Sequence, residues 1–355
     1  MNRLDRLFEI LPKRVDSVLI TSDVNRRYFT GMKSSAGVAL AFRGKAYLLV
    51  DFRYIEKARE TVTAAEVIEA KKIYPQIAKL LLAHGAKNIA IEAQDVTVSR
   101  LNKMKKLLKG FDIIETDTLS NAINDLRMFK DDEELACIKK AQEIAESAFE
   151  GILGFIKEGV TEREIAHELE RLMMANGAEG ISFETIALSG ENTSMPHGVP
   201  SDKAVRQGEF VLMDFGAVYN GYHSDMTRTV CVGQPTEEMA EVYEIVLKAQ
   251  QAAIEAAHSG MTGQELDSIA RSIIDEAGYG KRFGHALGHG VGLDIHELPN
   301  AAPYYKKELN PNAVVTVEPG IYIEGKFGVR IEDFVILTEN GCINLTKSAK
   351  NIISL

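Results

Sequence analysis

Short apolar blocks and amphipathic stretches alternate along the first third of the chain. The pattern predicts amphipathic helices at 2–9, 52–62, 75–84 and 98–109. It predicts strands at 17–21, 67–70, 88–92 and 111–115, and a hairpin over 37–51. Strands that alternate with helices form layered α/β domains, so the chain is expected to begin with one. Potential ligands do not cluster in this part of the sequence, and we expect it to contribute no catalytic residues.

The domain boundary is expected near residue 125. The charged segment 126–134 leads into a long helical pattern that ends near residue 157. A chain of 355 residues is long for a single hydrophobic core, so two domains are the default expectation. We therefore assign 1–125 to the N-terminal domain and 126–355 to a second domain.

The second domain contains an internal repeat. Residues 159–165 (GVTEREI) resemble residues 260–266 (GMTGQEL), and a long helix precedes each copy. Both copies contain Thr-x-x-Glu, a capping box, and both are followed by a periodic helix that ends at Gly177 or Gly278. Capped helices can look alike by chance, but the matching flanks favour duplication.

Duplication predicts an α+β domain with a pseudo-twofold axis. Each half is expected to contain two helices followed by a β-ribbon, with the ribbons centred on 220–221 and 314–337. The two ribbons are expected to meet at a shared centre, with the helices outside.

An Asn-Gly dipeptide at 220–221 predicts a β-hairpin that carries two aspartates. This dipeptide lies between two apolar runs and suits the positive φ angles of a type I′ turn. With that turn Asp214 opposes Thr227, and Asp225 points to the same face as Asp214. Two carboxylates on one buried face repel each other unless a cation lies between them. The alternative is that one aspartate caps a loop or pairs with Arg228.

Histidines follow in two glycine-containing segments. His197 lies in a Pro-His-Gly sequence, and the glycine-rich run 284–297 contains His285, His289 and His296. Four glycines in that run oppose helix formation, so a turn or an irregular strand is expected there. The run does not match the zinc-binding helix HExxH. A lone histidine is usually a satisfied polar residue, but three in one glycine-rich run favour a catalytic or metal-binding role.

Two glutamates are predicted on apolar strands. Glu318 ends the strand at 313–317, directly before a Pro-Gly pair, and Glu332 lies inside the strand predicted at 328–337. A glutamate inside an apolar strand is costly unless it is paired or bound to a metal. Arg330 shares a face with Glu332, so an ion pair between them is the alternative to metal binding.

The remaining candidates are two aspartates, two glutamates and one histidine, an oxygen-rich set with one imidazole. Such a set suits two divalent ions, Mn²⁺ or Co²⁺ first and Zn²⁺ or Fe²⁺ as alternatives. Paired ions generate a nucleophile from water near neutral pH, so hydrolysis is the expected chemistry.

Charge, cysteines and hydropathy limit the partners. The net charge of −10 argues against a nucleic-acid partner, which needs a basic face. Three cysteines without a CxxC pair indicate neither a disulfide framework nor a zinc ribbon. The N-terminus lacks the features of a signal peptide, and no apolar run approaches the roughly 20 residues that cross a bilayer. We therefore expect a cytoplasmic protein that binds neither nucleic acid nor membrane.

Together these motifs resemble those of the pita-bread metallopeptidases, in the Xaa-Pro branch of aminopeptidase P and prolidase. The motifs that carry the resemblance are Pro196-His197-Gly198, the aspartate pair in 213–225, the run 284–297, Val317-Glu318-Pro319-Gly320 and Arg330-Ile331-Glu332-Asp333. The first domain, including NRRYFTG at 25–31, looks like the creatinase-type (ribonuclease-H-like) domain of these enzymes. The resemblance implies a creatinase-type α/β domain followed by a pita-bread catalytic domain.

The resemblance also implies a role for each candidate. The implied metal ligands are Asp214, Asp225, His289, Glu318 and Glu332. Asp225 and Glu332 would bridge two divalent ions, Mn²⁺ first, and Glu318 would also shuttle a proton. By the same resemblance, His197 and His296 would bind the substrate and His285 would line the pocket on the proline side. Arg330 would orient a ligand carboxylate.

The implied substrates are peptides with proline at position 2, cleaved by a homodimer. Chain length and the GHALGH spelling at 284–289 favour an Xaa-Pro aminopeptidase, with the Xaa-Pro dipeptidase (prolidase) as the alternative. Methionine aminopeptidase shares the five ligands but generally lacks the N-terminal domain and the arginine at 330. A non-catalytic peptide-binding module is the most distant alternative, because such relatives lack the full ligand set.

Overall fold

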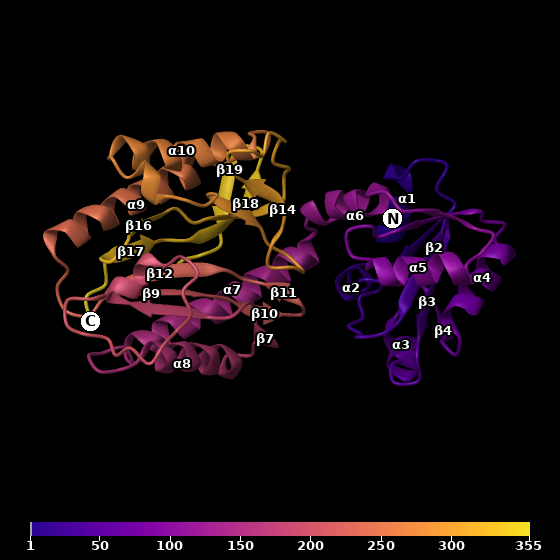
Figure 1. Ribbon diagram of the computed structural model, residues 1–355, viewed down its shortest axis with the longest axis horizontal. Helices are drawn as coiled ribbons and strands as arrows, with labels where there is room; N and C mark the ends of the chain where they lie inside the picture. Colours follow the sequence, from indigo (N-terminus) through magenta and orange to yellow (C-terminus); the bar gives the residue numbers. More distant parts are fainter. Residues whose placement is uncertain (1) are drawn as a thin grey trace. The chain divides into compact units, whose positions relative to one another are not determined.

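The computed structural model describes residues 2–355, and the chain divides into two compact units on either side of the bond between Arg127 and Met128 (Figure 1). Among the described residues, no helix is both long and apolar enough to cross a membrane. In the described part of the chain, none of the three cysteines, Cys137, Cys231 and Cys342, takes part in a disulfide.

The first unit is built on a six-stranded sheet with the order β4-β3-β2-β1-β5-β6. β1 (Ser17–Ile20) pairs antiparallel with β2 (Val38–Phe42) and parallel with β5 (Asn88–Ile91). The other elements predicted here are β3 (Lys45–Val50), β4 (Glu66–Glu69), β6 (Asp112–Ile114), α1 (Arg3–Ile10), α3 (Ile55–Thr61), α4 (Ile73–Ala83) and α5 (Val98–Leu107). The predicted α/β layering is therefore confirmed, with small differences at the ends of elements.

Two helices of this unit, α2 (Asp23–Thr30) and α6 (Thr118–Met128), are not predicted by the apolar pattern. α2 buries three polar side chains, Asn25, Arg26 and Thr30. Arg26 Nε donates a hydrogen bond of 3.0 Å to Ser34 Oγ. Because such buried polar groups find their partners only in the folded chain, the inward face of α2 does not read as apolar in the sequence.

The second unit contains two pairs of helices, α7 (Asp132–Leu153) with α8 (Glu162–Ala175) and α9 (Glu237–Ala256) with α10 (Gly263–Glu276). Both predicted capping boxes are present at the starts of α8 and α10. The glycines that follow these helices have the left-handed φ angles of helix ends, +100° at Gly177 and +87° at Gly278.

Backbone contacts repeat in the two halves beyond the capping boxes. The amide of Gly159 donates to the carbonyl of Val205 at 2.9 Å, and the amide of Gly260 donates to the carbonyl of Leu309 at 2.8 Å. Isolated β-bridges join Thr161 to Ala204 and Thr262 to Glu308. The same helix start therefore makes the same backbone contacts in each half, which supports the predicted duplication.

The first ribbon has the predicted register. Asn220 and Gly221 both have positive φ, +47° and +74°. Tyr219 pairs with Tyr222, and Asp214 pairs with Thr227. The strands of this half are β7 (Gly180–Ile181), β8 (Ile186–Ser189), β9 (Phe210–Phe215), β10 (Ala217–Tyr219), β11 (Tyr222–His223) and β12 (Met226–Cys231).

The second ribbon meets the first at an isolated bridge between Thr227 and Glu332. The predicted strand 328–337 is wrong at its centre, since the chain leaves the ladder at Ile331 and Glu332. The amide of Glu332 donates to the carbonyl of Thr227 in the other half, at 3.1 Å, instead of to a neighbouring strand. The strands of this half are β13 (Gly288–Gly290), β14 (Glu297–Ala301), β15 (Val314–Val317), β16 (Gly320–Ile323), β17 (Phe327–Arg330), β18 (Asp333–Thr338) and β19 (Gly341–Asn344).

The helices of the second unit lie outside its strands, as expected. α9 and α10 lie along one side of the strands, and α7 and α8 lie along the other (Figure 1). The apolar core follows this division, because one cluster of buried side chains lies between α9, α10 and the second ribbon. A second cluster lies between α7, α8 and the first ribbon. The meeting point of the ribbons is thus enclosed by packed layers.

Candidate functional site

A cavity of about 550 Å³ lies where the two ribbons of the second unit meet. Its volume falls within the range of roughly 300–1,000 Å³ that is typical of small-ligand sites. The structure brings all nine candidate residues to its wall, namely His197, Asp214, Asp225, His285, His289, His296, Glu318, Arg330 and Glu332.

Asp214 and Asp225 come from the first ribbon. Asp214 lies in β9, and Asp225 lies directly before β12 and is 4% exposed. Arg330 Nη2 donates to Asp214 Oδ2 at 2.5 Å. Arg228 instead pairs with Asp333 at 2.7 Å, so the alternative in which it neutralises Asp214 or Asp225 is wrong.

Glu318 and Glu332 come from the second ribbon. Glu332 Oε2 accepts a hydrogen bond of 2.7 Å from Thr227 Oγ1. Glu318 follows β15 directly, as predicted, and Thr316 Oγ1 donates to its Oε1 at 3.3 Å. The alternative ion pair between Arg330 and Glu332 is also wrong, because the guanidinium pairs with Asp214.

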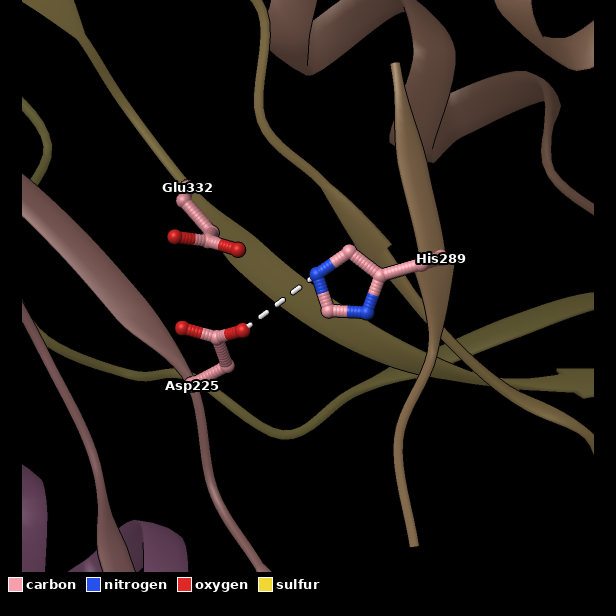
Figure 2. A group of neighbouring side chains, drawn as sticks. All are labelled: Asp225, His289 and Glu332. Atoms are coloured by element: carbon pink, nitrogen blue, oxygen red, sulfur yellow. Dashed lines mark ion pairs between the residues drawn. The ribbon is translucent and has the colours of Figure 1, made fainter. Parts of the chain in front are cut away.

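His289 faces these carboxylates from β13, and Figure 2 shows its ring directed at Asp225 and Glu332. These three residues each offer a ligand atom within 4.8 Å of the other two. His289 Nε2 lies 3.5 Å from Asp225 Oδ2 and 3.5 Å from Glu318 Oε1. Nδ1 lies 3.1 Å from the carbonyl of Gly290 and can only donate to it, which leaves the Nε2 lone pair directed at the acidic group.

The glycines around His289 allow a close approach of three strands. A Cβ at Gly288 would lie 1.9 Å from the carbonyl oxygen of Thr316, and one at Gly290 would lie 2.5 Å from that of Leu298. No side chain fits there, so glycine is required on both sides of the histidine. The expectation of an irregular strand is confirmed, since the β13 register shifts between His289 and Gly290.

Burial raises the pKa of three carboxyl groups in the cavity. It raises the pKa of Glu318 to about 8. The pKa of Asp225 is raised by burial first and then by the neighbouring charges of Asp214 and Glu318. The pKa of Glu332 is raised by burial and by the charge of Asp225. Like charges in a dry site cannot all ionise, and a cation among them reverses this effect.

The potential ligand atoms in the cavity suit a divalent metal. Asp214 Oδ1 and Glu332 Oε1 are buried without a hydrogen-bond partner, as is the hydroxyl of Thr185 in the cavity wall. Buried carboxylate oxygens are normally paired or bound to a metal. Burial lowers the pKa of His289 to about 4, so its ring is neutral at pH 7 and can act as a ligand. Oxygen-rich sites with one imidazole suit ions such as Mn²⁺.

A chain of hydrogen bonds crosses the cavity wall from Asp214 to His285. Arg330 Nη1 donates to the hydroxyl of Tyr322 at 2.9 Å, and that hydroxyl lies 2.9 Å from His285 Nε2. His285 Nδ1 lies 2.8 Å from the carbonyl of Ala286 and must donate to it, so Tyr322 donates to Nε2. Burial raises the pKa of Tyr322 to about 12 and lowers that of His285 to about 4, which keeps both groups neutral.

His197 and His296 are the exposed members of the site. They lie at the cavity wall on different segments, one after η1 (Gly190–Ser194) and the other before β14. The rings of His296 and His289 are 4.3 Å apart and inclined by 66°. Exposed imidazoles next to a buried acidic group are placed to meet a ligand that enters the cavity.

Sequence reasoning missed two residues of this network, Tyr322 and Thr227. Thr227 Oγ1 accepts a hydrogen bond of 3.1 Å from Arg330 Nε and donates one to Glu332. The period of two in strands places Thr227 on the face of Asp225, and this signal could have identified it. Tyr322 follows Glu318 by four residues, but the chain leaves the strand at Glu318 and Pro319, between β15 and β16, and this break interrupts the strand pattern.

Comparison with known proteins identifies the family. Residues 136–339 match the model of metallopeptidase family M24, and residues 3–129 match the creatinase/prolidase N-terminal domain. The chain is 43% identical over 353 residues to a Xaa-Pro dipeptidase of Pyrococcus furiosus, which covers 99% of both chains.

Solved structures agree over nearly the whole chain. A Xaa-Pro dipeptidase from Bacillus anthracis superposes with a TM-score of 0.96, at 41% identity and 99% coverage of both chains. An X-Pro aminopeptidase from Thermotoga maritima superposes with a TM-score of 0.93, at 39% identity, and covers 99% of this chain and 100% of its own.

These matches confirm the creatinase-type domain and the pita-bread domain that the motifs indicate. Because a family model and relatives above 40% identity cover the chain, its membership does not rest on motifs alone. The chain belongs to metallopeptidase family M24, in the pita-bread branch of prolidases and Xaa-Pro aminopeptidases, and is a metal-dependent hydrolase.

Proposed function

We propose that the protein is an Xaa-Pro dipeptidase, which hydrolyses the bond between the first residue and proline in a dipeptide. The observation that carries the proposal is the convergence of Asp225, His289 and Glu332 in the cavity. The glycine-containing sequence GHALGH at 284–289 favours an aminopeptidase. Two of the relatives described above, from Pyrococcus furiosus and Bacillus anthracis, are named Xaa-Pro dipeptidases and favour the shorter substrate.

Two divalent ions, Mn²⁺ first, would be held by Asp214, Asp225, His289, Glu318 and Glu332. The unpartnered oxygens of Asp214 and Glu332 support this assignment. When bound, such a pair supplies a nucleophile from water near neutral pH and polarises the scissile carbonyl.

Four residues of the chain would then handle the substrate. Glu318 lies within the acidic group and would accept a proton from the nucleophile and pass it to the leaving proline nitrogen. His197 and His296 would donate hydrogen bonds to the substrate and to its tetrahedral intermediate. His285, held neutral by burial, would line the pocket for the proline ring. Arg330 would hold Asp214 in a fixed orientation through their ion pair.

An Xaa-Pro aminopeptidase, acting on longer peptides with proline at position 2, is the second candidate. The cavity volume of about 550 Å³ supports it, because this volume does not restrict the site to a dipeptide. The Thermotoga maritima structure, with a TM-score of 0.93, bears the name of that activity.

Hydrolysis assays separate these functions. Metal-stripped protein is reloaded with Mn²⁺ and offered Ala-Pro, Ala-Pro-Pro-Ala and Met-Ala-Ser, with Asp225→Asn as the inactive control. Cleavage of Ala-Pro alone supports the dipeptidase, and release of alanine from the tetrapeptide supports the aminopeptidase. Release of methionine without Xaa-Pro cleavage would contradict both. No metal-dependent turnover would favour a peptide-binding module.

The protein is also proposed to act as a homodimer, as its family resemblance implies. Light scattering after size-exclusion chromatography tests this. Twice the chain mass of 39.1 kDa supports the dimer, and a single chain mass contradicts it.

A further inference from the structure

Segment 189–201 carries His197, and its residues 196–200 line the cavity. It begins at Ser189, the last residue of β8, passes through η1 and then continues without helix or strand. Two of its apolar side chains are solvent-exposed, Val199 at 77% and Met195 at 47%. An exposed segment of this kind needs fixed ends if the imidazole is to keep one position.

A single carboxylate, that of Glu162, holds both ends of segment 189–201. Its Oε1 accepts hydrogen bonds from the amide of Ser189 at 2.7 Å, from Ser189 Oγ at 3.1 Å and from Asn192 Nδ2 at 2.9 Å. Its Oε2 accepts from the amide of Ser201 at 3.0 Å and from Ser201 Oγ at 2.6 Å. Each oxygen therefore serves one end of the segment.

The side chain of Glu162 is completely buried. A buried carboxylate is tolerated only while donors surround it, and hydrogen bonds to a charged acceptor are roughly twice as strong as neutral ones. The middle of the segment has weaker support. Arg330 Nη1 lies 3.4 Å from the carbonyl of Pro196, and the amide of Gly328 donates to Thr193 Oγ1 at 2.7 Å. Glu162 thus accepts five hydrogen bonds at the two ends. Ser189 also pairs with Val211 in the sheet, and Lys203 Nζ donates to Ser189 Oγ at 2.8 Å.

The helix itself does not require this glutamate. Thr161 and Glu164 already form the capping box at the start of α8. The corresponding position of the other half is Gly263, where a Cβ would lie 1.9 Å from the carbonyl oxygen of Asn300. In that half the backbone at Gly263 lies directly against the backbone of Asn300. In the first half the carboxylate of Glu162 accepts hydrogen bonds from segment 189–201 instead. Glu162 is therefore a feature of the half that carries His197.

We infer that Glu162 is a positioning residue for His197, acting through segment 189–201. The inference rests on the proposed function for its effect on turnover. The hydrogen bonding of Glu162 to segment 189–201 is a separate property, and its effect on the segment can be measured without substrate.

Hydrogen exchange and kinetics of the metal-loaded enzyme test the inference with Glu162→Gln, His197→Ala and the double variant. Glu162→Gln replaces one acceptor oxygen by a donor, so amide exchange in 189–201 should become faster. Displacement of a catalytic group by about 1 Å can cost on the order of 100-fold in rate, so kcat/KM should fall about 10- to 100-fold, mostly in kcat. In the His197→Ala background the same change should cost less than about twofold, because the two residues act as one unit.

Glu164→Gln is the matched control. It removes the same charge from the same helix turn but leaves the donors of segment 189–201 untouched. Its exchange in 189–201 and its kcat should stay close to wild type. Equal losses from Glu162→Gln in the wild-type and His197→Ala backgrounds would overturn the positioning role, as would equal exchange in the Glu162 and Glu164 variants.

Two neutral variants keep the test decisive if Glu162→Gln does not fold. Ser201→Ala and Asn192→Ala each delete one donor, and each should reproduce part of the faster exchange and part of the loss in kcat. If the wild-type enzyme cleaves no Xaa-Pro peptide, the proposed function fails, and the exchange comparison alone still decides whether Glu162 holds the segment.

Discussion

Single oxygen atoms distinguish the carboxylates of the cavity from others in the chain. Asp333 is as deeply buried as Glu332, but its oxygens receive hydrogen bonds from Arg228, Asn344 and Lys350. Glu332 Oε1 and Asp214 Oδ1 receive none. Adjacent residues in the sequence thus have different chemistry, because only one of them faces a complete set of donors.

Glu332→Gln is expected to remove metal binding and turnover. The amide cannot replace a negatively charged ligand, and altered contacts behind a ligand already cost about 10- to 100-fold, so kcat/KM should fall by at least about 100-fold. Metal analysis after dialysis should show less bound metal than in the wild type. Glu324→Gln, at an exposed glutamate, is the control. Full metal content in Glu332→Gln would contradict the ligand role.

Arg330→Lys should reduce activity although it keeps the charge. The guanidinium contacts Asp214 and Tyr322 with separate nitrogens, and a single ammonium cannot reproduce this geometry. We expect a loss of about 10- to 100-fold in kcat/KM, measured with saturating metal. Arg53→Lys changes an exposed ion pair with Asp51 and should have no effect. Wild-type kinetics in Arg330→Lys would show that fixing Asp214 is unimportant.

At the scale of elements, the two halves use the same helix start for different purposes. The capping boxes of α8 and α10 have the same residues and the same hydrogen bonds. The position after each cap differs, with Glu162 in one half and Gly263 in the other. The placement of the helix start is therefore repeated in the two halves, while the side chains at equivalent positions make different contacts in each half.

Thr161→Ala and Thr262→Ala are each expected to destabilise the second unit. Loss of an N-cap hydroxyl costs about 1 kcal/mol in the free energy of unfolding. Chemical unfolding followed by circular dichroism measures this cost, and Thr→Ser at either position should retain most of the stability. Strongly unequal effects at the two positions would contradict the structural equivalence of the caps.

The capping glutamates should make part of this stability depend on pH. Hydrogen bonds from the amides and hydroxyls of Thr161 and Thr262 lower the pKa of Glu164 and of Glu265. A lowered folded-state pKa stabilises the fold above the ordinary value and loses this effect as pH falls through the folded value. Replacing both glutamates with glutamine should therefore lower the unfolding temperature at pH 7 and have a smaller effect near pH 3. An equal effect at both pH values would contradict this.

At the scale of the whole molecule, the cavity lies entirely in the second unit, and its carboxylates come from both halves of that unit. The raised pKa values of Asp225, Glu318 and Glu332 indicate an acidic group that is costly to charge without a counter-ion. A metal that binds only the folded chain must then stabilise the second unit as a whole.

Metal removal should lower the unfolding temperature. A ligand present at 100 times its dissociation constant stabilises the folded state by about 2.7 kcal/mol. Scanning calorimetry with a chelator, and again after addition of Mn²⁺, measures the shift. Glu332→Gln should show a much smaller response. No change in the wild-type protein on chelation would contradict tight binding to the folded state.

Much of the fold follows from local sequence signals. The hairpin register came from the Asn-Gly turn, the helix starts came from Thr-x-x-Glu, and the alternation of apolar blocks defined the first domain. Helix α2 was missed because Asn25 and Arg26 are buried with hydrogen-bond partners. The alternative ion pair of Arg330 with Glu332 is wrong, because the guanidinium pairs with Asp214 in the other ribbon.

The sequence by itself determined most of the elements, the duplication and the types of residue at the site, since turns, caps and periodicity act over a few neighbours. Only the tertiary structure decided which charges meet. The partners of Arg330, Tyr322 and Glu162 lie far away in the chain, and their contacts form when layers pack. Burial also sets the protonation of Glu318, and burial is a property of the folded molecule.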